Sequence, residues 1–167
     1  MEKKIKTKDF VLRPIGINDA KNIYLFQQDA EAKKNLAWIP NSIERVKKDI
    51  IAELKKKDRE TLVIDVEGQA VGEITLSMII PNHKGKLGFW IAKEYRGKGI
   101  MTKAVKLATD YWFKKYRLKR IYANTRKWNK PSARVLEKAG FKFEGLIRKD
   151  VMKDGKYYDN LLFAKIR

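Results

Sequence analysis

The sequence predicts an α+β fold, in which helices pack on a mixed, mostly antiparallel sheet. Segments rich in β-branched residues alternate with amphipathic segments whose apolar residues recur at helical spacing. Short hairpins come first and a strand–helix–strand–helix unit follows, so two strands can lie parallel with a helix crossing between them. The 167 residues, 44% of them hydrophobic, are enough for one core, and we expect a single domain over residues 1–167.

The first part of the chain predicts one strand and two helices. The strand covers 10–15, and the first helix covers 18–28 before a polar link that leads to a Trp-Ile-Pro corner at 38–40. Asn41 is expected to cap the second helix. The core face of that helix is formed by residues at helical spacing: Ile43, Val46, Ile50 and Leu54.

The rest of the chain predicts two hairpins around a crossover. A Glu-Gly-Gln turn at 67–69 indicates the first hairpin, and Gly140 is the expected left-handed stop of the last helix. In chain order, the elements expected from residue 61 on are strands over 61–66, 70–76 and 86–92, a helix from near Thr102, a strand over 120–124, a helix over 131–139, and strands over 143–152 and 157–164. The strands on either side of the helix from Thr102 are the pair expected to lie parallel.

Two glycines lie in the short segment between the strand over 86–92 and the helix that follows it, which reads Arg96-Gly97-Lys98-Gly99-Ile100-Met101. Glycine lets the backbone come close to a ligand, and the N–H groups of a first helical turn carry partial positive charge. An anion would therefore meet several donors at once. The segment predicts a turn that binds phosphate.

The net charge of +19 is concentrated in the second half of the chain. Residues 1–80 hold 15 Lys and Arg against 13 Asp and Glu, whereas residues 81–167 hold 24 against 7. Such a charge attracts anionic ligands and speeds their arrival. Two interpretations stay open for the surplus: a Lys-rich surface that keeps the protein in solution, or contact of this half with a polyanion such as ribosomal RNA.

The residue types exclude several classes of site. The chain has no cysteine, which excludes disulfides, zinc–thiolate sites and a cysteine nucleophile, and the scarcity of soft ligands argues against a metal site. The only histidine, His83, lies in a loop-like segment, so a catalytic role is not expected. The N-terminus lacks the apolar core of a signal peptide and no apolar run could span a bilayer, so we expect a cytoplasmic protein without a membrane partner.

The glycine turn, placed after a strand and opening a helix, resembles motif A of the GNAT superfamily of acetyl-CoA-dependent N-acetyltransferases. The segment from Asn129 to Phe141 is similar to the Asn-x-x-Ser/Ala…Glu-Lys-x-Gly-Phe segment of the same superfamily. An N-terminal segment (12–15 followed by 19–20) and a C-terminal segment (154–159) are similar to its branch of ribosomal-protein N-terminal acetyltransferases, the RimJ/RimL-like proteins. Two positions depart from the pattern: Met101 stands where Gly or Ala is common, and Leu136 stands where many members carry a Tyr that can act as an acid.

The resemblance implies a GNAT-like α/β/α sandwich in which the parallel strands splay apart, with the pantetheine arm of the co-substrate acetyl-CoA in the gap. By position, the pyrophosphate would bind backbone N–H groups of the glycine turn. The main chain of the preceding strand would bind the pantetheine and polarise the thioester carbonyl. The residues assigned in this way to acetyl-CoA are Phe89, Trp90, Ile91, Arg96, Gly97, Lys98, Gly99, Ile100, Met101, Thr102 and Asn129.

The same resemblance implies that Ser132 lies near the sulfur and could donate a proton to the leaving thiolate. Asn129 and Ser132 each have a structural alternative, because Asn129 can cap the helix over 131–139 and Ser132 can serve its first turn. Phe89 and Ile91 are expected in the core in any case.

The general base has three candidates, because Lys86 stands where many members of the superfamily carry a carboxylate. Glu73 is the first, since a carboxylate within an apolar strand can hold a water or shift its pKa by burial; the alternative is that it faces solvent. Asp150 is the second, and deprotonation through water without a dedicated base is the third. The candidate walls of an acceptor pocket are Trp38, Trp128 and Tyr158.

The predicted function is transfer of an acetyl group from acetyl-CoA to a primary amine by direct attack in a ternary complex. A protein N-terminal amine, for example that of a ribosomal protein, is the first candidate acceptor. The positive charge disfavours a cationic polyamine, although a small-molecule amine stays an alternative. A non-catalytic protein that binds CoA or RNA on the same fold is the other, and the chain is expected to be a monomer or a homodimer.

Overall fold

The computed structural model describes residues 4–36 and 39–167. In that part of the chain, eight strands form one sheet in the order β1-β2-β3-β4-β5-β6-β8-β7. Their bounds are β1 (Ile5–Lys6), β2 (Val11–Pro14), β3 (Glu60–Val66), β4 (Gln69–Ile80), β5 (Lys84–Ile91), β6 (Arg120–Arg126), β7 (Lys142–Lys153) and β8 (Lys156–Ile166). Every neighbouring pair is antiparallel except β5 and β6. The predicted mixed sheet with one parallel pair is therefore confirmed.

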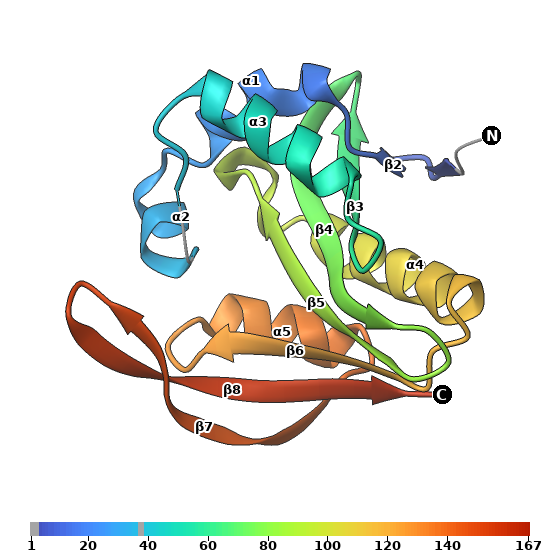
Figure 1. Ribbon diagram of the computed structural model, residues 1–167, viewed down its shortest axis with the longest axis vertical. Coiled ribbons are helices and arrows are strands. Elements are labelled where there is room, and N and C mark those ends of the chain that lie inside the picture. Colours follow the sequence, from blue (N-terminus) through green and yellow to red (C-terminus); the bar gives the residue numbers. More distant parts are fainter. Residues whose placement is uncertain (1–3, 37–38) are drawn as a thin grey trace.

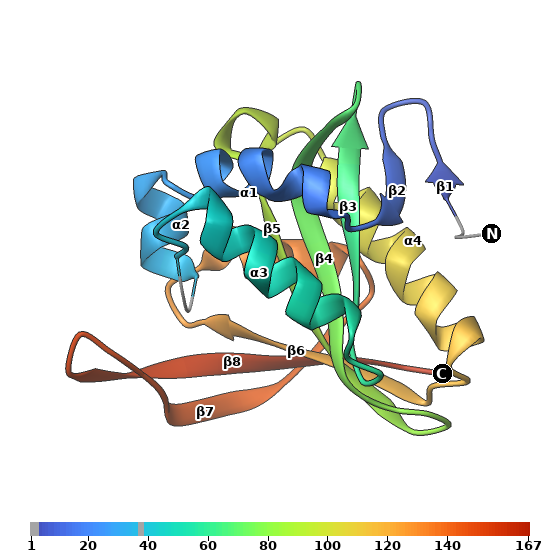
Figure 2. The same cartoon turned by 45° about the horizontal axis from the view of Figure 1, so that its top comes forward.

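Helices cover both faces of the sheet, which confirms the predicted α/β/α sandwich (Figures 1 and 2). Helices α1 and α3 pack on one face, and α4 and α5 pack on the other. The helix bounds are α1 (Ala20–Phe26), α2 (Ala30–Asn35), α3 (Ile43–Leu54), α4 (Ile100–Lys115) and α5 (Lys130–Lys138), with short 3₁₀ turns at Ile17–Asp19 and Lys93–Tyr95.

The main core lies between the sheet and helix α4. Trp112 of α4 is fully buried there and donates its indole N–H to Glu60 at the start of β3, over 2.9 Å. A smaller core on the other face joins α1 and α3 to Val63 and Ala70. Because both faces are buried, the central strands β3 and β4 carry apolar side chains in both directions instead of alternating.

Local sequence signals explain where several elements begin and end. Glu67 and Gly68 take left-handed φ angles of +51° and +83°, as the turn between β3 and β4 requires. Gly140, the residue after the C-cap Ala139 of α5, has φ +89°, which confirms it as the stop of that helix. Helix α3 is capped by Ser42, whose hydroxyl accepts a hydrogen bond from the backbone N–H of Arg45, so the expected cap at Asn41 is wrong by one residue.

Two other predictions differ from the structure in the first part of the chain. The helix expected over 18–28 is divided into a 3₁₀ turn and α1, and the polar link after it contains the short helix α2. Asp29 caps α2 by accepting from the backbone N–H groups of Glu31 and Ala32, both over 2.9 Å. The expected corner at Trp38 lies outside the described residues.

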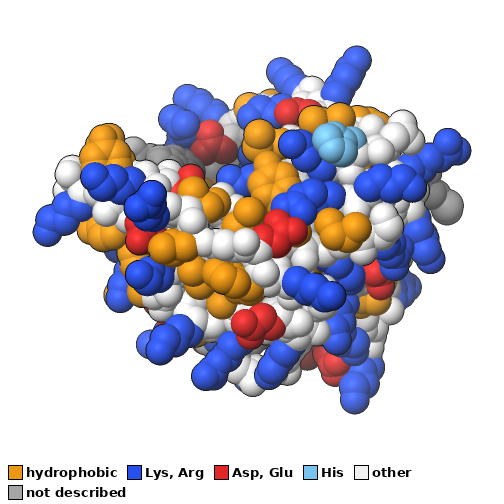
Figure 3. Space-filling model, turned by 90° about the horizontal axis from the view of Figure 1, so that it is seen from below, with side chains coloured by type: hydrophobic (Ala, Val, Ile, Leu, Met, Phe, Trp, Pro, Cys, Tyr) orange, Lys and Arg blue, Asp and Glu red, His pale blue; other side chains and the backbone are white. Residues whose placement is uncertain are grey.

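The surface is basic over the second half of the chain. Figure 3 views the molecule from the side of β7 and β8, and Lys and Arg side chains are spread over this face with few acidic ones between them. Strands β7 and β8 also carry exposed apolar side chains: Phe143, Leu146, Met152 and Tyr157. None of the described helices is long and apolar enough to cross a membrane.

Candidate active site

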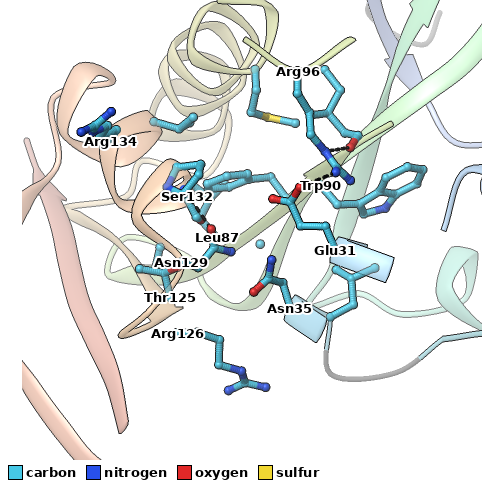
Figure 4. A pocket seen from close by; sticks show the side chains of 18 of the residues that line it. Glu31, Asn35, Leu87, Trp90, Arg96, Thr125, Arg126, Asn129, Ser132 and Arg134 are labelled. Atoms are coloured by element: carbon cyan, nitrogen blue, oxygen red, sulfur yellow. Dashed lines mark hydrogen bonds and ion pairs between the residues drawn. The ribbon is translucent and has the colours of Figure 1, made fainter. Parts of the chain in front are cut away.

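A cavity of about 880 Å³ lies where the two parallel strands separate. Strands β5 and β6 pair only at Lys84–Lys86 with Arg120–Tyr122, and beyond these residues they diverge (Figure 1). The cavity is lined from both strands, and Figure 4 shows Ser132 and Asn129 of the α5 segment facing Glu31 and Asn35 of α2 across it. The splayed pair that the resemblance implied is therefore present.

The glycine turn at one end of the cavity has the geometry of an anion site. Gly97 and Gly99 both have φ +76°, a conformation that side chains disfavour, and a Cβ at either position would meet open space. The first hydrogen bond of α4 runs from Lys103 N to Gly99 O, so the N–H groups just before Lys103 have no partner within the helix. The first turn of α4 also holds no acidic residue to neutralise its partial charge. A phosphate group fits these donors.

The edge of β5 that faces β6 is open along the cavity. Beyond Lys86, β5 pairs with β4 on one side, whereas on the other side no described strand pairs with it. Phe89 and Ile91 turn their side chains to the main core, as expected, and Trp90 turns to the opposite face. Backbone N–H and C=O groups at this edge can therefore pair with an extended ligand such as pantetheine.

Asn129 and Ser132 lie together at the start of α5, and both line the cavity. The side-chain oxygen of Asn129 accepts a hydrogen bond from the backbone N–H of Ser132 over 3.2 Å. Asn129 therefore caps α5, as the structural alternative proposed. Because it also lines the cavity, the same side chain can still contact a cofactor. The roles of both residues in catalysis or binding stay predictions.

Arg96 reaches away from the glycine turn and holds α2 against the cavity (Figure 4). Its guanidinium donates to Glu31 Oε2 over 2.7 Å and to Asp29 Oδ2 over 3.0 Å, and its Nε donates to the backbone oxygen of Ile91 over 3.1 Å. Contact of Arg96 with the pyrophosphate therefore stays a prediction. In the structure, Arg96 links the glycine turn to α2.

A polar network lies on the sheet face opposite α4 and α5, at the other end of the cavity. Asp150 Oδ2 accepts from Asn160 Nδ2 over 2.7 Å and from Asn124 Nδ2 over 3.2 Å. Arg126 in turn donates to Asn160 Oδ1 over 3.2 Å. An irregularity in β7 positions the carboxylate, because its register against β8 shifts between Ile147 and Val151.

The structure brings together most of the predicted site residues, but of the residues assigned to acetyl-CoA or to catalysis it leaves Lys98 and Glu73 outside the cavity. Lys98 places its ammonium over the ring of Tyr95. His83, for which no catalytic role is expected, lies in the exposed turn before β5. Glu73 lies on β4 beneath α1 and α3, where its carboxylate accepts a hydrogen bond from the indole N–H of Trp90. The predicted residues that line the cavity are Phe89, Trp90, Ile91, Arg96, Gly97, Gly99, Ile100, Met101, Thr102, Asn129, Ser132 and Asp150.

Burial raises the pKa of Glu73 to about 7, although the hydrogen bond from Trp90 opposes this. A raised folded-state pKa means that the folded chain holds this proton more tightly than the unfolded chain does. The contribution of Glu73 to stability is therefore fully present below about pH 4.5 and is lost as the pH rises through about 7. The full effect is on the order of 3 kcal/mol, because a pKa difference of one unit corresponds to about 1.4 kcal/mol.

We expect the variant Glu73→Gln to lose this pH dependence, since a neutral amide can still accept from Trp90. Urea unfolding of both proteins between pH 5 and 8 measures it: the free energy of unfolding of Glu73→Gln should exceed that of the parent by more at pH 8 than at pH 5. A constant difference between the two proteins over this range would contradict the buried, proton-binding carboxylate.

The cavity residues that were not predicted from the sequence include four polar ones: Glu31, Asn35, Arg126 and Asn160. A signal for the first two was present, because Asp29 is a favoured N-cap residue and Ala-Glu-Ala-Lys-Lys after it consists of good helix formers. No local pattern marks the other two, which meet only through the register of β6 with β8.

A second cavity of about 610 Å³ lies against α2 and the turn between β7 and β8. Trp128 and Tyr158, the described members of the predicted acceptor wall, pack edge to face there with ring centroids 5.0 Å apart. The indole N–H of Trp128 also donates to Asn35 Oδ1 over 3.1 Å, which holds the end of α2. Among the described residues, no group of three or more His, Cys, Asp or Glu side chains could hold a metal ion.

Comparison with known proteins places this geometry in a family. Residues 9–142 match the model of the acetyltransferase (GNAT) domain. Probable N-acetyltransferase YjcK of Bacillus subtilis is 33% identical over 96% of this chain and 95% of its own, and spermidine N(1)-acetyltransferase of Escherichia coli is 28% identical over 87% and 80%. The solved ribosomal-protein-S5-alanine acetyltransferase of Vibrio fischeri is 27% identical with a TM-score of 0.88, covering 99% of this chain and 97% of that one.

The predicted resemblance is confirmed by these matches, including the similarity to ribosomal-protein acetyltransferases. The family model covers both the glycine turn and the Asn129–Phe141 segment on which the resemblance depended. The chain therefore belongs to the GNAT family of N-acetyltransferases, enzymes that use acetyl-CoA as co-substrate.

Proposed function

We propose that this enzyme acetylates the N-terminal α-amine of a protein. The observation that carries the proposal is that one cavity passes through the opening between β5 and β6. The glycine turn and Asn129 line it from the side of α4 and α5, and the network around Asp150 lines it from the opposite face. Two substrates can therefore approach one point from opposite faces, as direct transfer in a ternary complex requires.

Each end of the cavity supplies one part of the chemistry. The amine nitrogen attacks the thioester carbonyl carbon, an N–C bond forms and the C–S bond breaks. The open backbone edge of β5 offers N–H groups to the oxygen that becomes negative. Asp150 takes the proton from the amine, a role that we assign to it instead of Glu73 because only Asp150 lines the cavity. Ser132 supplies the proton that the departing thiolate takes up.

The charges in the cavity favour a peptide over a polyamine as acceptor. Its acidic side chains are Glu31, which Arg96 already neutralises, and Asp150. Besides Arg96, four cationic side chains line it: Lys86, Arg126, Arg134 and Lys138. A polyamine would meet an excess of like charge, although a relative acetylates spermidine. The S5-alanine acetyltransferase neighbour makes a ribosomal protein the first acceptor to try.

A panel of amines tests the proposed function. Consumption of acetyl-CoA is followed with peptides that have a free or a blocked N-terminus, with spermidine and with small primary amines, and mass spectrometry locates the acetyl group. We expect turnover with free N-termini and none with blocked ones. Turnover with spermidine alone would assign the enzyme to small amines. RNA affinity without any turnover would instead favour the non-catalytic alternative.

Replacement of Ser132 with Ala is expected to lower kcat by about 10 to 100-fold while the affinity for acetyl-CoA stays within about twofold, because the hydroxyl acts only on the leaving thiolate. Steady-state kinetics and calorimetry measure the two quantities. Ser77→Ala, on β4 outside the cavity-lining residues, is the matched control. Equal losses of kcat and affinity would make Ser132 a structural residue of the α5 N-terminus.

A further inference from the structure

Arg126 is a buried cation at the acceptor end of the cavity. The residue is 8% exposed and lines the cavity, and Figure 4 shows it extending from β6 on the side of Asn35. Among the residues that the structure describes, its hydrogen-bond partner is the amide oxygen of Asn160. Burial lowers the pKa of Arg126, and the nearby carboxylate of Asp150 opposes this. A guanidinium has five donors, so most of its hydrogen-bonding capacity is left for a ligand.

The neighbours of Arg126 show what that ligand carries. Asp150 directs one carboxylate oxygen to Asn160 and Asn124, and it makes no hydrogen bond to Arg126. Asn124 Oδ1 is fully buried and closed to the cavity, so a ligand does not reach it. The ligand that satisfies this end of the cavity therefore brings an anionic acceptor for Arg126.

The second cavity is also lined mainly by cationic side chains, so it too favours a negatively charged ligand. Lys33, Lys34 and Lys153 line it, against one acidic residue, Asp154. It lies on the other side of α2, whose inner residues line the main cavity, so both cavities share that helix. Figure 1 shows α2 and the turn between β7 and β8 at the open end of the gap between β5 and β6. A chain that enters the gap from this end passes these lysines.

We infer that the preferred acceptor is a protein N-terminus with acidic residues in its first few positions, whose first carboxylate binds Arg126. This inference rests on the proposed function, and it adds the class of N-terminus that the enzyme selects. Lys33 and Lys34 of the second cavity hold the acidic residues that follow, whereas Lys153 donates to the backbone oxygens of these two lysines and holds the β7–β8 turn against α2. A neutral N-terminal segment would leave Arg126 short of an acceptor, and a basic segment would be repelled at both cavities.

Three peptides of equal length test the inference directly. They share the first residue and differ at the second to fourth positions, which are Glu, Gln or Lys. We expect kcat/KM for the acidic peptide to exceed that for the neutral one by at least about tenfold, and the basic peptide to be the poorest, because a close buried charge pair contributes more than about 1.4 kcal/mol.

Two sets of variants assign the preference to residues. Arg126→Gln should reduce the acidic-to-neutral ratio of kcat/KM, measured within the variant, to about twofold or less. The double variant Lys33→Glu/Lys34→Glu alters only exposed side chains, so the test survives if Arg126→Gln fails to fold. It should lower the ratio and improve the basic peptide. Its matched control is Lys47→Glu/Lys48→Glu on the exposed face of α3, which should leave the ratio unchanged.

The outcomes separate this inference from the proposed function. Equal kcat/KM for the acidic and neutral peptides, or a preference for the basic one, overturns the inference and leaves N-terminal acetylation standing. Acetylation of small amines with no peptide turned over overturns both. If no amine is turned over, the affinities of the acidic and basic peptides for the protein saturated with CoA are measured by calorimetry. The inference is overturned if the acidic peptide binds no more tightly than the basic one.

Discussion

Replacement of Gly99 with Glu is expected to weaken acetyl-CoA binding by at least about 100-fold, to the point where turnover is lost at ordinary concentrations. Two physical effects add. Gly99 has φ +76°, so any side chain strains the turn that precedes α4. The new carboxylate would also stand beside the donors that face the phosphates and repel them. Calorimetry with the purified variant measures the affinity.

Gly68→Glu is the matched control for this variant. Gly68 has φ +83° in the turn between β3 and β4, a Cβ there also meets open space, and it lies outside the cavity. The control should lose a comparable amount of stability and keep its affinity for acetyl-CoA. Unchanged affinity in Gly99→Glu, or an equal loss in both variants, would show that the glycine turn does not hold the phosphates.

Replacement of Asp150 with Asn is expected to lower kcat by about 10² to 10⁴-fold, the range that general-base catalysis contributes. An amide oxygen can still accept from Asn160 and Asn124, so the network keeps its form while the proton acceptor is removed. The affinity for acetyl-CoA should change little, because the glycine turn lies at the other end of the cavity. Steady-state kinetics with an N-terminal peptide measures the loss.

The pH dependence separates a base from a positioning residue. A free α-amine has a pKa of about 8, so raising the pH from 7 to 9 supplies neutral amine from solution, and Asp150→Asn should recover part of its activity. The control Asp110→Asn removes an exposed carboxylate of α4 that pairs with Lys165 and Arg167, and should keep full activity. A loss in Asp150→Asn that does not diminish at high pH would contradict the base assignment.

The parts of the site that follow from local rules could be predicted from the sequence. Two glycines between a strand and a helix indicate a turn with positive φ angles that a ligand can approach closely, and Gly97 and Gly99 have this geometry. Asn129 is a favoured N-cap residue and precedes Lys-Pro at the start of a helix, and the structure places it at the N-cap of α5. Such signals act within a few residues, so tertiary structure does not need to be known.

The acceptor end could not be predicted because it is assembled from distant segments. Arg126 and Asn160 meet through the pairing of β6 with β8, and Asp150 joins them only because the register of β7 shifts. Glu73 was the first candidate for the base, yet strand alternation alone does not say which face of β4 the cavity uses. Helix α2 was taken for a link, since six residues give little periodicity.

Acetyl-CoA is expected to lie between the diverging strands β5 and β6, with its diphosphate on the glycine turn. A crystal structure of the protein with CoA would show whether it does. We expect phosphate oxygens within hydrogen-bond distance of the backbone N–H groups between Gly97 and Thr102, pantetheine paired along β5, and the sulfur beside Ser132. CoA bound instead on the basic surface of β7 and β8, with the cavity empty, would contradict this expectation.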